Sequence, residues 1–140
     1  MHVFTYGTLM YDIVWTRVVR ARYRSDSARL VGFRRCKVRC EAYPCLVPGK
    51  GTVEGRLYFD VHRDDLERLD RFEGAQYDRL ERFCHTEGGL YIPAAVYLWK
   101  EEFRYHVDPA PWLVADFKRN GLERFIRHYG GFARANTHPQ

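Results

Sequence analysis

Residues 77–99, with the sequence YDRLERFCHTEGGLYIPAAVYLW, contain the pattern that decides the fold. Two β-prone runs, Tyr77 to Thr86 and Leu90 to Trp99, flank the pair Gly88-Gly89, which is typical of a tight hairpin turn. The second run is apolar at both odd and even positions, so we expect both faces of this strand to be covered. The stretch therefore predicts an antiparallel sheet with packed elements on both sides.

Further strands and short helices are predicted on either side of this hairpin. They are strands from His2 to Tyr6, Ala28 to Val38 and Thr52 to Val61; a short helix that Asp12 caps; loops at Tyr43-Pro44 and Pro48 to Gly51; a helix from Asp64 or Asp65 through Phe72, closed by Gly74; and a helix from Trp112 to Tyr129, interrupted near Asn120-Gly121. Many antiparallel strands with few helices indicate an α+β fold, built as a strongly bent sheet or small barrel with helices outside. We expect one domain over residues 1–132 and a flexible tail over residues 133–140.

The composition excludes several classes of protein. Aromatic residues make up 16% of the chain, which indicates a packed core and argues against disorder. No apolar run approaches the roughly 20 residues that a membrane helix needs. The N-terminus lacks the charged and apolar regions of a signal peptide. We therefore expect a cytoplasmic protein with no membrane partner.

The formal net charge of +5 is compatible with a nucleic-acid partner, an anionic substrate or neither. The basic residues are scattered, and only the segment from Arg17 to Arg39 is strongly of one sign. Scattered charge without a recognised binding module is weak support for nucleic-acid binding. We favour a solvated basic face and do not expect a nucleic-acid partner.

The four cysteines do not form a metal site by their spacing. They are Cys36, Cys40, Cys45 and Cys84, and no two have the C-x-x-C spacing of a zinc ribbon or redox site. Buried free thiols are the expected state in a cytosolic protein. An H-x-E sequence begins at His85, but no P-C-x-x-C follows it, which excludes a zinc deaminase. We expect no bound metal.

A sharp turn is predicted directly after the first strand, in Tyr6-Gly7-Thr8-Leu9-Met10. A glycine lets the chain turn there, and the amides that follow are then outside a sheet ladder. Successive free N–H groups in a turn can bind an anion. A plain turn after an edge strand would give the same pattern, so the residues alone leave both interpretations open.

Glu73 is predicted to lie on the apolar side of the helix expected over residues 64–72. It follows Leu66 by seven residues and Leu69 by four, which places it on the same stripe. Burial and the negative end of the helix both raise the pKa of a carboxyl group there, and such a group can take a proton and return it. Asp70 should lie at the edge of the stripe, in a wetter position. The alternative is that Glu73 turns to solvent or pairs with an arginine.

Together these features resemble the gamma-glutamylcyclotransferase-like superfamily. Val3 to Leu9 is similar to its Y-G-[ST]-L signature, and Leu69 to Gly74, followed by Tyr77 to Arg79, is similar to its second signature. Shorter similar pieces fall in the expected order at Tyr43-Pro44, Val53 to Gly55 and Ala95 to Tyr97. The resemblance spans most of the chain and is strongest to the branch of gamma-glutamylamine cyclotransferase and the plant avirulence-induced proteins.

The resemblance implies a small mixed or antiparallel β-barrel with flanking helices, and an enzyme of the transferase or lyase type. In the implied reaction the α-amine of a gamma-glutamyl group attacks its own side-chain amide carbonyl, so that 5-oxoproline forms and an amine leaves. The family's catalytic glutamate falls on Glu73 as general acid/base. The resemblance also implies a pocket lined by Tyr6 to Leu9, no cofactor or metal, and a small gamma-glutamyl substrate as the partner.

Candidate substrate-binding groups follow from this reaction. The amides of Gly7, Thr8 and Leu9 are candidates to bind the substrate α-carboxylate or the developing oxyanion. The candidates to place hydroxyl groups in the pocket are Tyr6, Tyr43, Tyr77 and Tyr97. For each of these, a plain core tyrosine is the alternative. A non-catalytic module that binds an acidic small molecule on the same fold is the alternative function, and the leaving amine and the oligomeric state are left open.

Overall fold

The computed structural model describes residues 1–128, apart from the side chains of Asn120 and His128. Its strands are β1 (Val3–Thr5), β2 (Ser25–Val38), β3 (Pro44–Tyr58), β4 (Tyr77–Thr86), β5 (Tyr91–Trp99) and β6 (Val107–Pro111). Its helical segments are η1 (Thr8–Met10), α1 (Asp12–Val18), α2 (Arg63–Glu73), η2 (Glu101–His106), α3 (Val114–Asp116), η3 (Phe117–Gly121) and α4 (Leu122–His128). The expected helix end at Tyr129, the expected domain end at 132 and the predicted tail lie outside the described residues.

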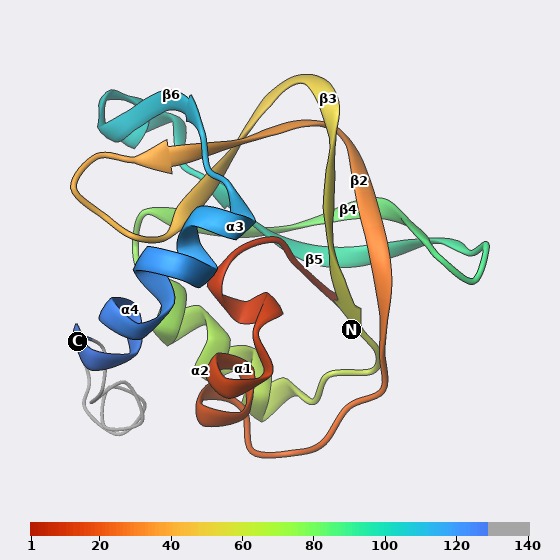
Figure 1. The fold of residues 1–140 in the computed structure, drawn as a ribbon. Coiled ribbons are helices and arrows are strands. Elements are labelled where there is room, and N and C mark those ends of the chain that lie inside the picture. The colour runs from red at the N-terminus through yellow and green to blue at the C-terminus, as the bar shows by residue number, and fades with distance from the viewer. Residues whose placement is uncertain (129–140) are drawn as a thin grey trace.

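Five of the strands close into a barrel (Figure 1). They follow the order β3-β1-β5-β4-β2, and pairing of β2 with β3 completes the ring. Strand β6 pairs with β2 outside this ring. The β1–β5 pair is parallel and the other pairs are antiparallel. The predicted α+β fold, a small mixed β-barrel with flanking helices, is therefore confirmed.

Two apolar clusters lie on opposite faces of the barrel wall. The inner cluster receives side chains from all five barrel strands, among them Phe4, Leu30, Leu57, Cys84 and Val96. The outer cluster lies between the wall and the helices. Strand β5 supplies alternate residues to the two clusters, as its apolar pattern predicts, and all residues from 94 to 99 are buried.

Strand β3 begins earlier than predicted, because Pro44 and residues 48–51, expected as loops, lie within it, and it ends at Tyr58 and not at Val61. The register between β2 and β3 shifts there: Val31 pairs with Thr52 and Phe33 with Pro48. Gly32, at φ 96°, thus stands alone opposite three residues of β3. The extra residues form a bulge that bends the strand and preserves pairing on both sides of it. Proline and glycine here mark a bulge and not a chain reversal.

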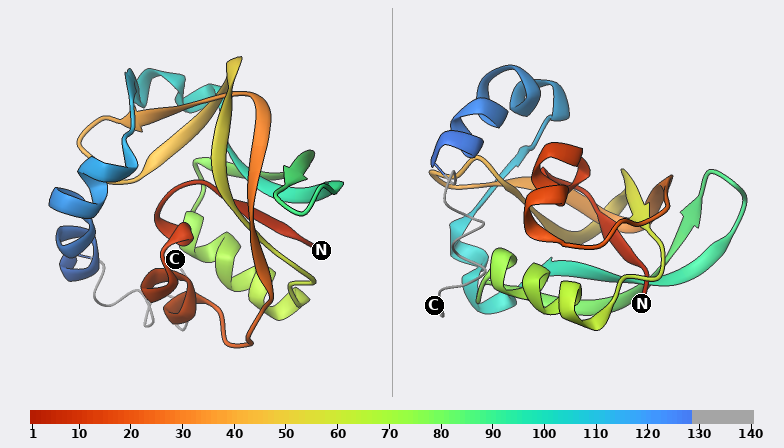
Figure 2. Two further views of the ribbon diagram at one scale, coloured as in Figure 1. Left: turned by 45° about the vertical axis from the view of Figure 1, so that its right-hand side comes forward. Right: turned by 90° about the horizontal axis from the view of Figure 1, so that it is seen from below.

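Helices α1 and α2 lie side by side against one side of the barrel (Figure 2). The Trp15 ring of α1 stacks on Tyr58 of β3 with ring centroids 3.6 Å apart. Tyr11 is the N-cap of α1, so the prediction that Asp12 caps this helix is off by one residue. Helix α2 ends at Gly74 as predicted, where φ is 91° and the amide donates to Asp70.

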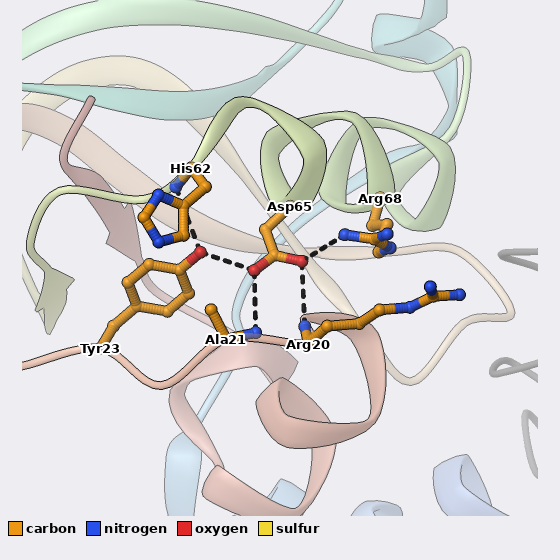
Figure 3. Close-up of polar contacts among 6 residues, drawn as sticks. All are labelled: Arg20, Ala21, Tyr23, His62, Asp65 and Arg68. Carbon is orange, nitrogen blue, oxygen red and sulfur yellow. Dashed lines mark hydrogen bonds and ion pairs between the residues drawn. The ribbon is translucent and has the colours of Figure 1, made fainter.

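Asp65 of α2 holds the segment that follows α1 (Figure 3). Its carboxylate is buried and accepts hydrogen bonds from the amides of Arg20 (2.9 Å) and Ala21 (3.1 Å), from the Tyr23 hydroxyl and from Arg68 (2.7 Å). Burial alone would raise the pKa of Asp65, but these donors outweigh it and lower the pKa below its ordinary value. The network fixes α2 against the N-terminal part of the chain.

The C-terminal helix is interrupted where the sequence predicts it. The π-helical turn η3 separates α3 from α4. A Cβ atom at Gly121 would lie 2.7 Å from Cδ1 of Phe117, so the glycine allows this close approach. Phe117 and Phe125 are both buried, which places α4 against the body of the protein.

Three of the four cysteines are buried free thiols, as predicted. Cys40 is the exception: β2 ends at Val38, and Cys40 is exposed in the turn that follows, at φ 64°. In the part of the chain that the structure describes, no helix combines the length and apolarity needed to span a membrane.

Candidate active site

A single cleft brings together every site residue predicted from the sequence. It lies where β1 ends and η1 begins, and it is called the inner cleft below. Its lining residues are Phe4, Thr5, Tyr6, Gly7, Thr8, Leu9, Tyr43, Pro44, Glu73, Tyr77 and Tyr97. The inner cleft has a volume of about 20 Å³, which is room for one group the size of a water molecule.

The turn after β1 depends on Gly7. A Cβ atom at this position would lie 2.5 Å from Cγ of Pro44, a distance that real side chains do not adopt. The turn closes through a hydrogen bond of 3.0 Å from the Met10 amide to the Gly7 carbonyl. Within residues 1–128 the amides of Gly7, Thr8 and Leu9 meet no protein acceptor. Three consecutive N–H groups are therefore available to an anion in the inner cleft.

Arg35 of β2 stabilises this turn through hydrogen bonds. It was not among the site residues predicted from the sequence. Its Nη1 donates to the carbonyl oxygens of Tyr6 (2.9 Å) and Glu54 (3.1 Å), and its guanidinium lies over the Trp112 ring. Because Arg35 is half-buried and bonds carbonyl groups of two chain segments, it does not belong to a fully solvated basic face. Its neighbour Arg34 is exposed, and nothing in the local sequence distinguishes the two.

Glu73, the last residue of α2, lines the inner cleft and is half-buried. No hydrogen-bond donor or cation among the described residues pairs with its carboxyl group. Burial, and then the negative charge of Asp70, raise its pKa to about 8. The C-terminal end of α2 acts in the same direction. The pairing of Glu73 with an arginine, one alternative left open by the sequence, does not occur here.

Asp70 lies one helical turn before Glu73 and is tied to two other groups. Its Oδ1 accepts a hydrogen bond from the Tyr97 hydroxyl at 2.7 Å and forms an ion pair with Arg79 Nε at 3.0 Å. The Asp70 side chain is 40% exposed, in keeping with the wetter position predicted for it. Asp70 is thus held by two partners at the position from which it raises the pKa of Glu73.

The three buried tyrosines of the inner cleft, Tyr6, Tyr77 and Tyr97, each donate a hydrogen bond to an acceptor within the protein. Tyr6 donates to the Tyr97 carbonyl at 2.5 Å, and Tyr77 donates to the Pro44 carbonyl at 2.7 Å. Burial raises the pKa of Tyr6, Tyr77 and Tyr97, so these phenols stay neutral. Their oxygen lone pairs can still accept hydrogen bonds from a substrate ammonium. Tyr43 is half-buried, and its ring packs 6.4 Å from that of Tyr77.

The chemistry of the inner cleft is that of proton transfer beside an anion-binding turn. Its groups are a carboxyl with a raised pKa, three available amides and neutral phenols. The Thr8 hydroxyl also has no hydrogen-bond partner among the described residues. Among the side chains that the structure describes, no group of three or more His, Cys, Asp or Glu is placed to hold a metal ion.

A family model described as "Gamma-glutamyl cyclotransferase, AIG2-like" matches residues 3–114. The chain belongs to this family. Among curated relatives, AIG2-like protein A from Arabidopsis thaliana is 28% identical over 144 residues, which cover 99% of this chain and 85% of that protein. AIG2-like protein D from the same plant is 28% identical over 147 residues, covering 100% and 94%.

Solved structures share the fold across nearly the whole chain. A solution structure of an Arabidopsis thaliana protein superposes with a TM-score of 0.68 at 29% identity, covering 99% of this chain and 94% of that one. A structure named gamma-glutamyl cyclotransferase superposes with a TM-score of 0.65 at 19% identity, covering 92% and 85%. At that level of identity the likeness shows that the two share the cyclotransferase-like fold.

Proposed function

We propose that this protein is a cofactor-free gamma-glutamyl cyclotransferase that converts a gamma-glutamyl amide into 5-oxoproline and a free amine. The observation that carries the proposal is the Glu73 carboxyl, which lies unpaired among the described residues, has a raised pKa and lines the same cleft as the free amides of the η1 turn. Membership of the gamma-glutamyl cyclotransferase, AIG2-like family supports this reaction class.

The reaction begins with the substrate α-ammonium in the inner cleft, which has room for one group of that size. The oxygen atoms of the buried tyrosines accept its hydrogen bonds, and the ionised Glu73 carboxylate removes one proton. The free amine then attacks the side-chain amide carbonyl of the same molecule. Because nucleophile and carbonyl belong to one substrate, positioning supplies much of the rate.

The second half of the reaction returns the proton. The new C–N bond closes a five-membered lactam, and the carbonyl oxygen carries negative charge that the amides of the η1 turn can stabilise. Protonated Glu73 gives its proton to the departing nitrogen as the old C–N bond breaks. The ring nitrogen still carries two protons, and the regenerated Glu73 carboxylate passes the second of them to the released amine, which leaves as its ammonium form. The products are 5-oxoproline and the amine, and no water is consumed. One carboxyl with a pKa near 8 can serve as base and then as acid.

The test is to incubate the protein with a panel of gamma-glutamyl amines, gamma-glutamyl dipeptides and glutathione and to measure 5-oxoproline. We expect turnover of part of the panel, and Glu73→Gln should lose it by at least about a hundredfold while its circular dichroism stays unchanged. Full activity of Glu73→Gln would overturn the role of Glu73. Ligand-dependent thermal stabilisation without product on any substrate would favour a binding module for acidic small molecules.

A further inference from the structure

A second cavity, of about 170 Å³, adjoins the inner cleft on the side of Glu73. It is called the outer pocket below, and its lining residues are Thr8, Tyr43, Phe72, Glu73, Tyr77 and Phe125. Thr8, Tyr43, Glu73 and Tyr77 line both cavities. A substrate whose reacting carbonyl lies beside Glu73 can therefore reach into both cavities, and only the outer pocket has room for a group larger than a water molecule.

The walls of the outer pocket are aromatic. Phe72 and Phe125 meet edge to face with ring centroids 6.2 Å apart, and the rings of Tyr43 and Tyr77 form a second pair, 6.4 Å apart. None of the described residues that line the pocket is a lysine, arginine or histidine. A carboxylate on the leaving amine would thus be desolvated near Glu73 without a counter-charge, which is strongly unfavourable.

The size of the outer pocket suits one aromatic ring. An apolar cavity of about 150 Å³ in another protein is large enough to bind benzene. A ring in the outer pocket would contact Phe72 and Phe125 with the tilted or offset geometry that aromatic pairs prefer. Such contacts would add binding energy to a substrate whose leaving amine carries a ring.

Phe125 comes from a part of the chain that the family match does not include. The match ends at residue 114, whereas Phe125 lies in α4. Its side chain is buried and also packs 6.0 Å from the ring of Phe117. The aromatic wall of the outer pocket is thus completed by the C-terminal helix of this chain.

We propose that the outer pocket selects gamma-glutamyl amides whose leaving amine is neutral and carries an aromatic ring, with Phe125 as a specificity-determining residue. This inference rests on the proposed cyclotransferase function. It predicts that gamma-glutamyl amides of aryl-alkylamines are better substrates than gamma-glutamyl amino acids.

The test compares three substrates that differ by one feature each. Gamma-glutamyl-phenethylamine carries a ring, gamma-glutamyl-phenylalanine adds only a carboxylate to it, and gamma-glutamyl-methylamine lacks the ring. We expect kcat/KM for the phenethylamide to exceed both others by at least about tenfold. Calorimetry with the Glu73→Gln variant, which retains a neutral group of the same shape, should rank the three Kd values in the same order.

The role of Phe125 is tested by Phe125→Ala, with Phe83→Ala as the matched control. Phe83 is exposed on β4 and does not line the outer pocket. We expect Phe125→Ala to reduce the preference for the phenethylamide over the methylamide by about tenfold. The Phe83→Ala protein should behave as the parent. If Phe125→Ala does not fold, Phe125→Leu should give a smaller reduction of the same preference.

The possible outcomes distinguish a failure of the outer-pocket assignment from a failure of the proposed cyclotransferase reaction. Equal or better use of gamma-glutamyl-phenylalanine, with 5-oxoproline formed, would overturn the inference and leave the cyclotransferase reaction standing. Tighter binding of the phenethylamide without 5-oxoproline from any substrate would support the pocket assignment and overturn the reaction. A Phe125→Ala protein that loses activity equally on the phenethylamide and the methylamide would exclude Phe125 as a specificity determinant.

Discussion

Two carboxyl groups on the same helix have pKa values shifted in opposite directions. Asp65 is buried, yet four donors around it lower its pKa below the ordinary value. Glu73 has no such donor among the described residues, so burial dominates and its pKa rises to about 8. The number of nearby hydrogen-bond donors therefore separates the two carboxyl groups. Asp65 is held ionised and stabilises the fold, whereas Glu73 is left without a donor in the part of the chain that the structure describes and can exchange a proton with a substrate.

The raised pKa of Glu73 predicts that the free energy of unfolding depends on pH. Between the ordinary value of 4.5 and about pH 8, the folded state holds a proton that the unfolded state has lost. The free energy of unfolding should therefore fall as pH rises through this window and show no further contribution from Glu73 above it.

Urea unfolding of the parent and of Glu73→Gln between pH 4 and 9 measures this dependence. The window from 4.5 to about 8 spans about 3.5 pKa units, and one unit corresponds to about 1.4 kcal/mol. The variant should therefore gain at most on the order of 5 kcal/mol relative to the parent across the window, and less where solvent screens the half-buried carboxyl. A stability difference that is independent of pH would show that the Glu73 carboxyl titrates normally.

Asp65→Asn should destabilise the protein by about 2–3 kcal/mol at pH 7, because hydrogen bonds to a buried carboxylate are replaced by weaker ones to a neutral amide. The depressed pKa of Asp65 contributes stability above its unfolded value of 3.8, and this contribution is lost as pH falls through the lower folded pKa. The gap between the two proteins in urea unfolding should accordingly narrow below about pH 4. Exposed Asp64 provides the control, and Asp64→Asn should change stability by less than about 0.5 kcal/mol.

At the scale of elements, the turn between β1 and η1 depends on close packing against the start of β3. Gly7 and Pro44 approach so closely that no side chain fits between them, and Arg35 bonds the carbonyl of the preceding Tyr6. The position of the three free amides is thus set by neighbouring strands and not by the turn alone.

Gly7→Ala should displace this turn from Pro44. We expect kcat/KM for a gamma-glutamyl amide to fall by at least about tenfold, with a loss of stability of about 1–3 kcal/mol from overpacking. Gly88→Ala in the β4–β5 turn is the matched control, since a Cβ atom there meets only ordinary contacts at 3.6 Å or more. Activity of Gly7→Ala equal to that of the Gly88→Ala control would contradict the assigned role of the turn.

The elements that could be predicted from the sequence are those with a local signal. Helix α2 has its amphipathic stripe and a terminal glycine, and the β4–β5 hairpin has alternating residues around Gly88-Gly89. The part of β3 around Pro48 was predicted as a loop, because a bulge and a chain reversal use the same residue types. The length of β3 is determined by its pairing with β2. The local sequence of β3 carries no information about that pairing.

The same distinction applies to the site. Glu73 and the residues from Tyr6 to Leu9 lie within short sequence signatures that resemble those of a known family. The structure places them in one cleft. Arg35 and Phe125 were not predicted as site residues. Their positions depend on long-range contacts, the first with the end of β1 and the second with the ring of Phe72.

At the scale of the whole molecule, the barrel serves as a frame that brings three distant parts of the chain together. The end of β1 supplies the amides, the C-terminal end of α2 supplies Glu73, and α4 closes the outer pocket with Phe125. The network around Asp65 holds α2 to the N-terminal segment, so the carboxyl and the amides keep a fixed relation.

The pH dependence of kcat/KM on a gamma-glutamyl amide tests the central role of Glu73 most directly. Because the carboxylate form must accept the first proton, activity should rise with pH on a limb with an apparent pKa of about 8. Asp70→Asn removes the neighbouring charge that contributes to this raised pKa, so its limb should move to lower pH on the same substrate. A limb that lies at the same pH in both proteins, or activity that is flat from pH 5 to pH 9, would contradict the account.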